Sequence, residues 1–169
     1  FGVAEASEAD TAVRLRDWSL QRQDTARGKP DTATSRYTTQ VVGEHFGLQL
    51  QFDATQPLLL QGQQGLSRKG PQAAQASYYY SQPQLAVSGR LVLDGRTLPI
   101  DTQQPARAWM DHEWSEALLA NDAVGWDWIG MNLLDGSALT ALRLRRADGT
   151  ALWAGGSFRA VGQATRVFT

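Results

Sequence analysis

Residues 123–158 read AVGWDWIGMNLLDGSALTALRLRRADGTALWAGGSF, and this stretch decides the fold class. Apolar and polar residues alternate through it, which is typical of strands that bury one face. Asp135-Gly136 and Asp148-Gly149 interrupt the alternation, and Asp-Gly is favoured where a type I′ hairpin turn needs positive φ at both central residues. The stretch therefore predicts a three-stranded antiparallel meander.

Strand patterns fill the rest of the chain as well. A third Asp-Gly pair, Asp94-Gly95, joins the alternating segments Val87–Leu93 and Thr97–Ile100 into another hairpin. A helical turn is expected only over Ser115–Ala120, with Ser115 as its cap. Further strands are expected at Val13–Leu20, Arg36–Val42 and Phe46–Phe52, with a loop from Asp24 to Ser35. These patterns predict an all-β class, an antiparallel barrel or sandwich.

Composition narrows the function classes. The 169 residues are 42% hydrophobic and 20% charged with a net charge of −1, which is the globular range and gives no basic stripe for nucleic acid. The absence of cysteine excludes disulfides, thiolate catalysis and cysteine-built zinc sites, and two histidines argue against a multi-histidine metal site. The chain starts at Phe1 and ends as a strand begins, so we expect a piece of a longer protein.

The segment 108–115, AWMDHEWS, is the first candidate for chemistry. On a strand, Asp111 and Glu113 face one side together with Trp109, while His112 and Trp114 face the other. Carboxylates two residues apart on a strand lie about 7 Å apart. Inside a barrel they would repel, and one would hold its proton, as general acid/base catalysis requires. His112 is the alternative proton carrier at neutral pH.

The segment 125–132, GWDWIGMN, is the second candidate. Trp126, Trp128 and Asn132 fall on one face of a strand, and Asp127 falls on the other between the two indoles. A structural interpretation stays open for both segments: aromatic residues on strands usually belong to the core, and an inward acid often pairs with a buried arginine such as Arg143 or Arg145.

Three consecutive tyrosines form a third feature. Alternation places Tyr78 and Tyr80 together and Tyr79 opposite them, so that the hydroxyls line a pocket or lie at a barrel rim. The glycine-rich segment 61–70 precedes them. It has no Walker spacing and no helix after it, so the pattern does not favour phosphate binding.

Taken in order, these segments resemble the AttH-like/carotenoid 1,2-hydratase (hydroxyneurosporene synthase) family. The resemblance spans roughly residues 14–159 and is carried by the glycine-rich segment 61–70, ASYYYS at 76–81, AWMDHEWS at 108–115, GWDWIG at 125–130 and LWAGGS at 152–157. It implies lipocalin-like antiparallel β-barrels in tandem, of which this chain is the central part. Residues 1–118 would then complete an N-terminal barrel, and residues 119–169 would open the second one.

The resemblance also implies a chemistry. Carotenoid hydratases add water across a terminal prenyl double bond without a cofactor, and many AttH-like members are known only as predicted secreted hydrolases or lipoproteins. The catalytic candidates are Asp111, His112, Glu113 and Asp127. The ligand-binding candidates are Tyr78, Tyr80, Trp109, Trp114, Trp126, Trp128 and Asn132. No metal or organic cofactor is expected.

Two functions from different classes remain open at this point. One is a hydratase or hydrolase acting on an apolar prenyl-like or lipid-like molecule. The other is a non-catalytic envelope lipid carrier or structural module, in which the same acids only anchor the fold. A glycan site is a weaker third possibility, because same-face neighbours are poorly placed to flank a glycosidic bond. The family resemblance further predicts a bacterial, periplasmic or secreted location, with membrane association of the parent protein or a homodimer as possible partnerships.

Overall fold

The computed structural model describes residues 3–25, 35–100, 103, 105–116 and 119–169. Within these ranges the chain forms strands and turns and no helix, and its strands pair antiparallel in both sheets. The predicted all-β antiparallel class is therefore confirmed. No helix in these ranges is long and apolar enough to cross a membrane.

The chain forms two compact units, each assembled from separate segments. Unit 1 contains Phe1–Pro57 and Leu85–Ala108, and unit 2 contains Leu58–Gln84 and Trp109–Thr169. The boundary at residues 118 and 119 that the sequence predicts refers to the halves of a longer protein, and it stays a prediction. Residues 26–34 of the predicted loop and residues 117–118 of the predicted helical turn lie outside the described residues, as do residues 101, 102 and 104.

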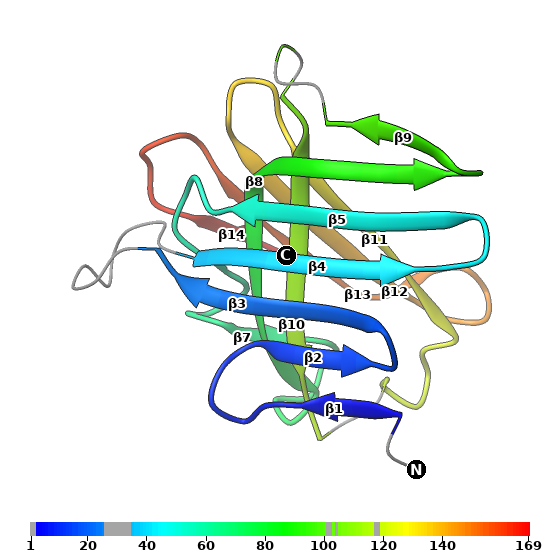
Figure 1. Cartoon of the computed structure of the whole chain (residues 1–169). Coiled ribbons are helices and arrows are strands. Elements are labelled where there is room, and N and C mark those ends of the chain that lie inside the picture. Colours follow the sequence, from blue (N-terminus) through cyan, green and yellow to red (C-terminus); the bar gives the residue numbers. More distant parts are fainter. Residues whose placement is uncertain (1–2, 26–34, 101–102, 104, 117–118) are drawn as a thin grey trace. The chain divides into compact units, whose positions relative to one another are not determined.

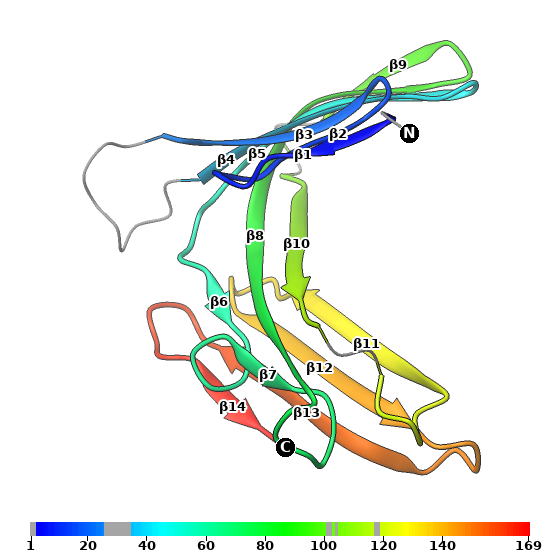
Figure 2. The same cartoon turned by 90° about the horizontal axis from the view of Figure 1, so that it is seen from below.

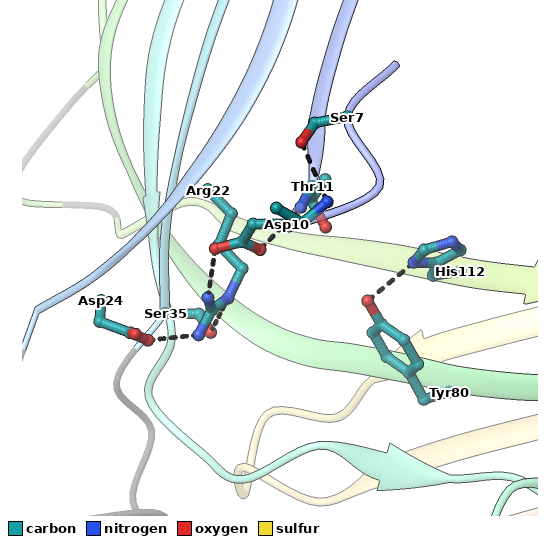
Figure 3. Close-up of polar contacts among 9 residues, drawn as sticks. Ser7, Asp10, Thr11, Arg22, Asp24, Ser35, Tyr80 and His112 are labelled. Carbon is teal, nitrogen blue, oxygen red and sulfur yellow. Dashed lines mark hydrogen bonds and ion pairs between the residues drawn. The ribbon is translucent and has the colours of Figure 1, made fainter. Parts of the chain in front are cut away.

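Unit 1 is one antiparallel sheet in which most neighbours in space are neighbours in sequence (Figure 1). Arg22 holds one end of this sheet, since its guanidinium donates to Asp10 Oδ2 over 2.8 Å and to Ser35 Oγ over 2.8 Å, and also pairs with Asp24 (Figure 3). The strands are β1 (Ala4–Ala6), β2 (Ala12–Leu15), β3 (Trp18–Asp24), β4 (Ser35–Val42), β5 (Phe46–Asp53), the second half of β8 (Ala76–Leu93) and β9 (Arg96–Pro99).

The prediction of one strand over Val13–Leu20 is wrong. The chain turns back at Arg16 and Asp17, where Arg16 has a φ of 53°, and β2 pairs with β3. The tight turn reverses the chain between Leu15 and Trp18, which are cross-strand partners. This turn explains why the alternation of apolar and polar residues changes face near Trp18.

Unit 2 contains two antiparallel arrangements of strands. The first half of β8 pairs with β6 (Leu59–Leu60) and β7 (Leu66–Arg68), and β10 (Arg107–Trp114) lies beside β8. A separate sheet has the order β11, β12, β13, β14 (Figure 2). It confirms the meander predicted from residues 123–158. Its strands are β11 (Gly125–Asn132), β12 (Ala138–Arg145), β13 (Ala151–Arg159) and β14 (Arg166–Phe168).

The Asp-Gly pairs mark turns where predicted, but two of the three turns have another geometry. Asp94 and Gly95 both have positive φ, at 47° and 76°, as a type I′ turn requires. At Asp135-Gly136 and Asp148-Gly149 only the glycine is positive. In these two turns the aspartate carboxylate instead accepts the backbone N–H two residues later, from Ser137 over 2.8 Å and from Thr150 over 2.9 Å. An Asx hydrogen bond of this kind stabilises a longer turn.

The interior of unit 2 is rich in polar side chains. Leu59, Tyr79 and Leu144 are buried there, but Gln61, Ser81 and Thr140 are buried as well. The Gln61 amide gives two of these polar groups a hydrogen-bond partner, because its Nε2 donates to Ser81 Oγ and to Thr140 Oγ1 over 2.9 Å each. Since Ser81 lies on β8 and Thr140 on β12, this amide joins the two strand arrangements of the unit.

Candidate functional site

The two faces of β8 and β10 carry different chemistry. Along β8, Tyr79 is 3% exposed and its neighbour Tyr78 is 56% exposed, so successive residues alternate between an inner and an outer face. Asp111 and Glu113 of β10 contact serines on the inner face of β8, while His112 contacts an outer tyrosine. As predicted, the two carboxylates lie on the face opposite His112.

Asp111 is held by hydrogen-bond donors on the inner face. Its Oδ1 accepts from Ser81 Oγ over 2.5 Å and from Trp109 Nε1 over 2.8 Å. Burial raises the pKa of the adjacent Tyr79 hydroxyl above its ordinary range, and the charge of Asp111 and a hydrogen bond with it act in the same direction. Tyr79 is therefore a neutral hydroxyl, which also accepts from Trp128 Nε1 over 3.0 Å.

Glu113 is the carboxylate with a cationic partner. Its Oε1 lies 2.8 Å from Lys69 Nζ and accepts a hydrogen bond from Ser77 Oγ over 2.5 Å. The Lys69 ammonium also lies 4.6 Å from the centre of the Tyr79 ring, a cation–π distance. The two inner carboxylates thus have different environments, because hydroxyl and indole groups surround Asp111 and an ion pair holds Glu113.

The outer face of β8 and β10 forms an aromatic cluster. Tyr80 OH lies 2.8 Å from His112 Nδ1, and the two side chains point toward each other (Figure 3). Tyr78 stacks on Trp114 with ring centres 5.5 Å apart and planes at 24°. The structure therefore brings together Tyr78, Tyr80, His112 and Trp114, on the face opposite Asp111 and Glu113.

A pocket of about 710 Å³ lies in unit 2 on the side of Glu113. Trp126 and Trp128 of β11 and Leu142 and Leu144 of β12 form much of its wall, which alternation places on one face of the sheet. Trp126 is 60% exposed and Trp128 is 43% exposed, so neither is a core residue of this chain. The lining also includes Lys69, Ala76, Ser77, Glu113, Trp114, Ser115, Leu119, Ala120, Asn121 and Ala123.

The other predicted site residues lie outside the lining of this pocket. Asp127 is on the opposite face of β11, where Arg143 donates to its Oδ2 over 2.6 and 3.0 Å and Arg145 Nε lies 3.1 Å from its Oδ1. The hydrogen bond from Arg143 is the main cause that lowers the pKa of Asp127. Asn132 shares the face of the tryptophans, but its Oδ1 accepts from the Gln84 backbone N–H over 2.7 Å.

Trp109 contacts the site from β10. Its ring centre lies 6.4 Å from that of Trp128 at 71°, an edge-to-face arrangement, and its indole N–H points to Asp111. The lining and the contacts of the acids contain residues that the sequence prediction missed. Ser77 and Ser81 could have been found, because they flank the tyrosines on the face of Tyr79. Lys69 carried no such signal, since only the fold brings it to Glu113.

The described residues contain no group of three or more histidine, aspartate or glutamate side chains that could hold a metal ion. The polar groups of the site are the Asp111 carboxylate, the ion pair of Glu113 with Lys69, and the hydroxyls and indoles around both.

The family model described as AttH-like matches residues 1–169. A crystal structure of a protein given the name AttH, from Nitrosomonas europaea, is 43% identical with a TM-score of 0.83, over 97% of this chain and 47% of that one. Kievitone hydratase from Nectria haematococca shares the fold at 15% identity, with a TM-score of 0.69 over 94% of this chain and 45% of that one. No curated protein matches.

The chain spans about half the length of each of these two solved proteins. The family model covers its whole length, and the identity to the Nitrosomonas protein extends over nearly all of it. The chain therefore belongs to the AttH-like family, with the all-β fold that this family shares with kievitone hydratase.

Proposed function

We propose that the pocket of unit 2 binds an apolar small molecule of prenyl or lipid type. The observation that carries this proposal is the wall of exposed tryptophan side chains and less exposed leucine side chains around a volume of about 710 Å³. Small-molecule sites have volumes of about 300–1,000 Å³ and are mostly apolar with a few polar groups. A hydrocarbon that fills the pocket removes its own surface and the indole faces from water, at about 25 cal/mol per Å².

The binding proposal is tested with the protein as it exists, by native mass spectrometry with lipid extraction and by uptake of a hydrophobic dye. Trp126→Ala removes one wall of the pocket and should weaken dye binding by about tenfold or more. Trp18→Ala is the matched control, because Trp18 is also exposed but belongs to unit 1. An empty protein that takes up no dye, or equal losses in both variants, would overturn the proposal.

A hydratase activity in the same pocket is the second candidate function. It is supported by the fold shared with kievitone hydratase and by Glu113 at the edge of an indole-lined pocket. In this reaction a proton adds to one carbon of a double bond, and water adds to the other carbon and releases a proton. The carboxylate that receives this proton can donate it to the next alkene, while the face of Trp128 stabilises the intermediate cation.

The hydratase candidate has its own test, which needs a compound that the binding experiment has identified. Asp111→Asn and Glu113→Gln should each abolish formation of a product heavier by one water, as measured by mass spectrometry. Unchanged turnover in both variants would exclude these acids from the mechanism. Binding without any turnover in the unchanged protein would leave the carrier function. A location at the bacterial envelope and pairing with a second copy remain proposals from the family resemblance.

A further inference from the structure

The charges of the unit 2 pocket are gathered at one place. Among the described residues of its lining, Lys69 and Glu113 alone carry a charge, and they form an ion pair. The other lining residues are aromatic, aliphatic or neutral polar, the last being Ser77, Ser115 and Asn121. A ligand whose apolar part lies against the aromatic and aliphatic side chains can therefore place one polar group at the ion pair.

The two charges are close together and partly withdrawn from water. Lys69 Nζ and Glu113 Oε1 are 2.8 Å apart, and the side chains are 19% and 40% exposed. Ser77, which is 3% exposed, donates a further hydrogen bond to the same oxygen. The ammonium also contacts the ring face of the buried Tyr79. Each charge therefore has a fixed position and a partner of opposite sign.

A pair of opposite charges disfavours a third charge. A ligand carboxylate that approaches Lys69 also approaches Glu113, and a ligand ammonium that approaches Glu113 also approaches Lys69. Because Lys69 and Glu113 are adjacent, the repulsion by one is similar in size to the attraction by the other, and the two effects offset each other. The charged ligand must also give up its hydration on entering the pocket.

A hydroxyl group has no such conflict. It can donate one hydrogen bond to the Glu113 carboxylate, which has two acceptor oxygens, and accept one from the Lys69 ammonium, which has three donors. Both of these bonds involve a charged partner, and such bonds are stronger than those between neutral groups. The ion pair can therefore bind a neutral group that has one hydrogen-bond donor and one acceptor.

We propose that the ligand of this pocket is an uncharged amphiphile, an apolar chain that ends in a hydroxyl held between Lys69 and Glu113. This inference rests on the proposed binding function and adds the head group. It assigns Lys69, Ser77 and Glu113 to ligand selection, with Ser77 as a positioning residue for the carboxylate. Free fatty acids and long-chain amines of equal length are discriminated against by the same pair.

The test compares three probes of equal chain length, decan-1-ol, decanoate and decylamine, by isothermal titration calorimetry at neutral pH. The unchanged protein should bind decan-1-ol about tenfold or more tightly than either charged probe, which corresponds to about 1.4 kcal/mol. This comparison needs no variant, so it does not depend on whether a substituted chain folds. Equal affinities for the three probes, or tighter binding of a charged one, would overturn the head-group inference.

Two variants should shift the preference toward charged probes of opposite sign. Glu113→Gln leaves Lys69 without its counter-charge and should raise the affinity for decanoate about tenfold, whereas Lys69→Gln should do the same for decylamine. Glu44→Gln and Arg96→Gln are the matched controls, because they make the same changes in net charge on exposed residues of unit 1. Both should leave the order of affinities unchanged.

The outcomes separate the two proposals. Binding of all three probes without a head-group preference, or a preference that the two pocket variants leave unchanged, overturns the uncharged-amphiphile inference while the apolar pocket function stands. Failure of all three probes to bind overturns the pocket function, and the inference with it. Opposite shifts by the two variants, absent from the controls, support both.

Discussion

At the scale of single residues, the three consecutive tyrosines show how strongly position on a strand decides chemistry. Tyr78 is mostly exposed and stacks on Trp114, whereas Tyr79 is buried and holds the indole N–H of Trp128. Tyr80 instead faces His112. The three tyrosines thus have different contacts, and of their hydroxyls only that of Tyr79 lies beside the Asp111 carboxylate.

Removal of the inner hydroxyl should cost stability. Tyr79→Phe removes the buried hydroxyl that accepts from the partly exposed Trp128 indole N–H, so the free energy of unfolding should fall by about 1 kcal/mol. The measurement is urea unfolding followed by circular dichroism. Tyr78→Phe is the control, and it should change stability by less than about 0.5 kcal/mol because its ring is exposed. Equal losses in the two variants would contradict this assignment.

At the scale of strands, β8 depends on one glycine. Gly89 has a φ of 122°, and a Cβ added there would lie 2.1 Å from the backbone oxygen of Gln49 on β5. No side chain fits at that distance, and the backbone conformation is one that L-residues rarely adopt. The backbone conformation and the close approach of β5 at position 89 therefore require glycine.

Gly89→Ala should accordingly lower the free energy of unfolding by about 3 kcal/mol, because backbone strain and a backbone clash add. Gly95→Ala is the matched control, since Gly95 has a φ of 76° but nothing within 4 Å of the added Cβ. The control should lose about 1 kcal/mol from strain alone. Thermal unfolding of both variants measures the difference, and a loss at Gly89 no larger than at Gly95 would disprove the clash.

Alternation and turn residues were enough to predict most strands, because both are local. The faces of Asp111 and His112 follow from the period of two, and all three Asp-Gly pairs do mark turns. The turn type at Asp135 was not predictable, since it depends on a carboxylate that bonds to the backbone of Ser137. The Lys69–Glu113 pair was not predictable either, because it joins residues on β10 and after β7 that only long-range pairing brings together.

At the scale of the whole molecule, neither unit is a continuous piece of chain. The chain passes from unit 1 to unit 2 after Pro57, returns after Gln84 and leaves again after Ala108. Strands β8 and β10 therefore contribute to both units. Each unit depends on contacts between segments far apart in sequence, which is the kind of topology that folds slowly.

Acid should destabilise the whole molecule. Hydrogen bonds lower the pKa of Asp53, from Arg36 above all, and those of Asp127, Asp135 and Asp148. A depressed pKa in the folded state contributes stability above the unfolded value of about 3.9, and this contribution is lost as the pH falls through the folded pKa. Stability measured by urea unfolding should thus decline from about pH 5 downward.

Asp53→Asn should make that decline shallower, because it removes the carboxylate whose Oδ1 pairs with Arg36 Nε over 2.5 Å. Glu8→Gln removes an exposed carboxylate from the same unit and serves as the control. An acid limb of identical slope in the unchanged protein and in Asp53→Asn would show that the pair contributes nothing to the pH dependence.

Three of the six tryptophans, Trp114, Trp126 and Trp128, line the pocket, and their exposed fractions lie between 43% and 60%. Indole emission moves to shorter wavelength when water leaves the ring. The chain therefore contains a native fluorescent reporter at its proposed binding site, and a molecule that enters the pocket should shift the tryptophan emission to shorter wavelength without any added label.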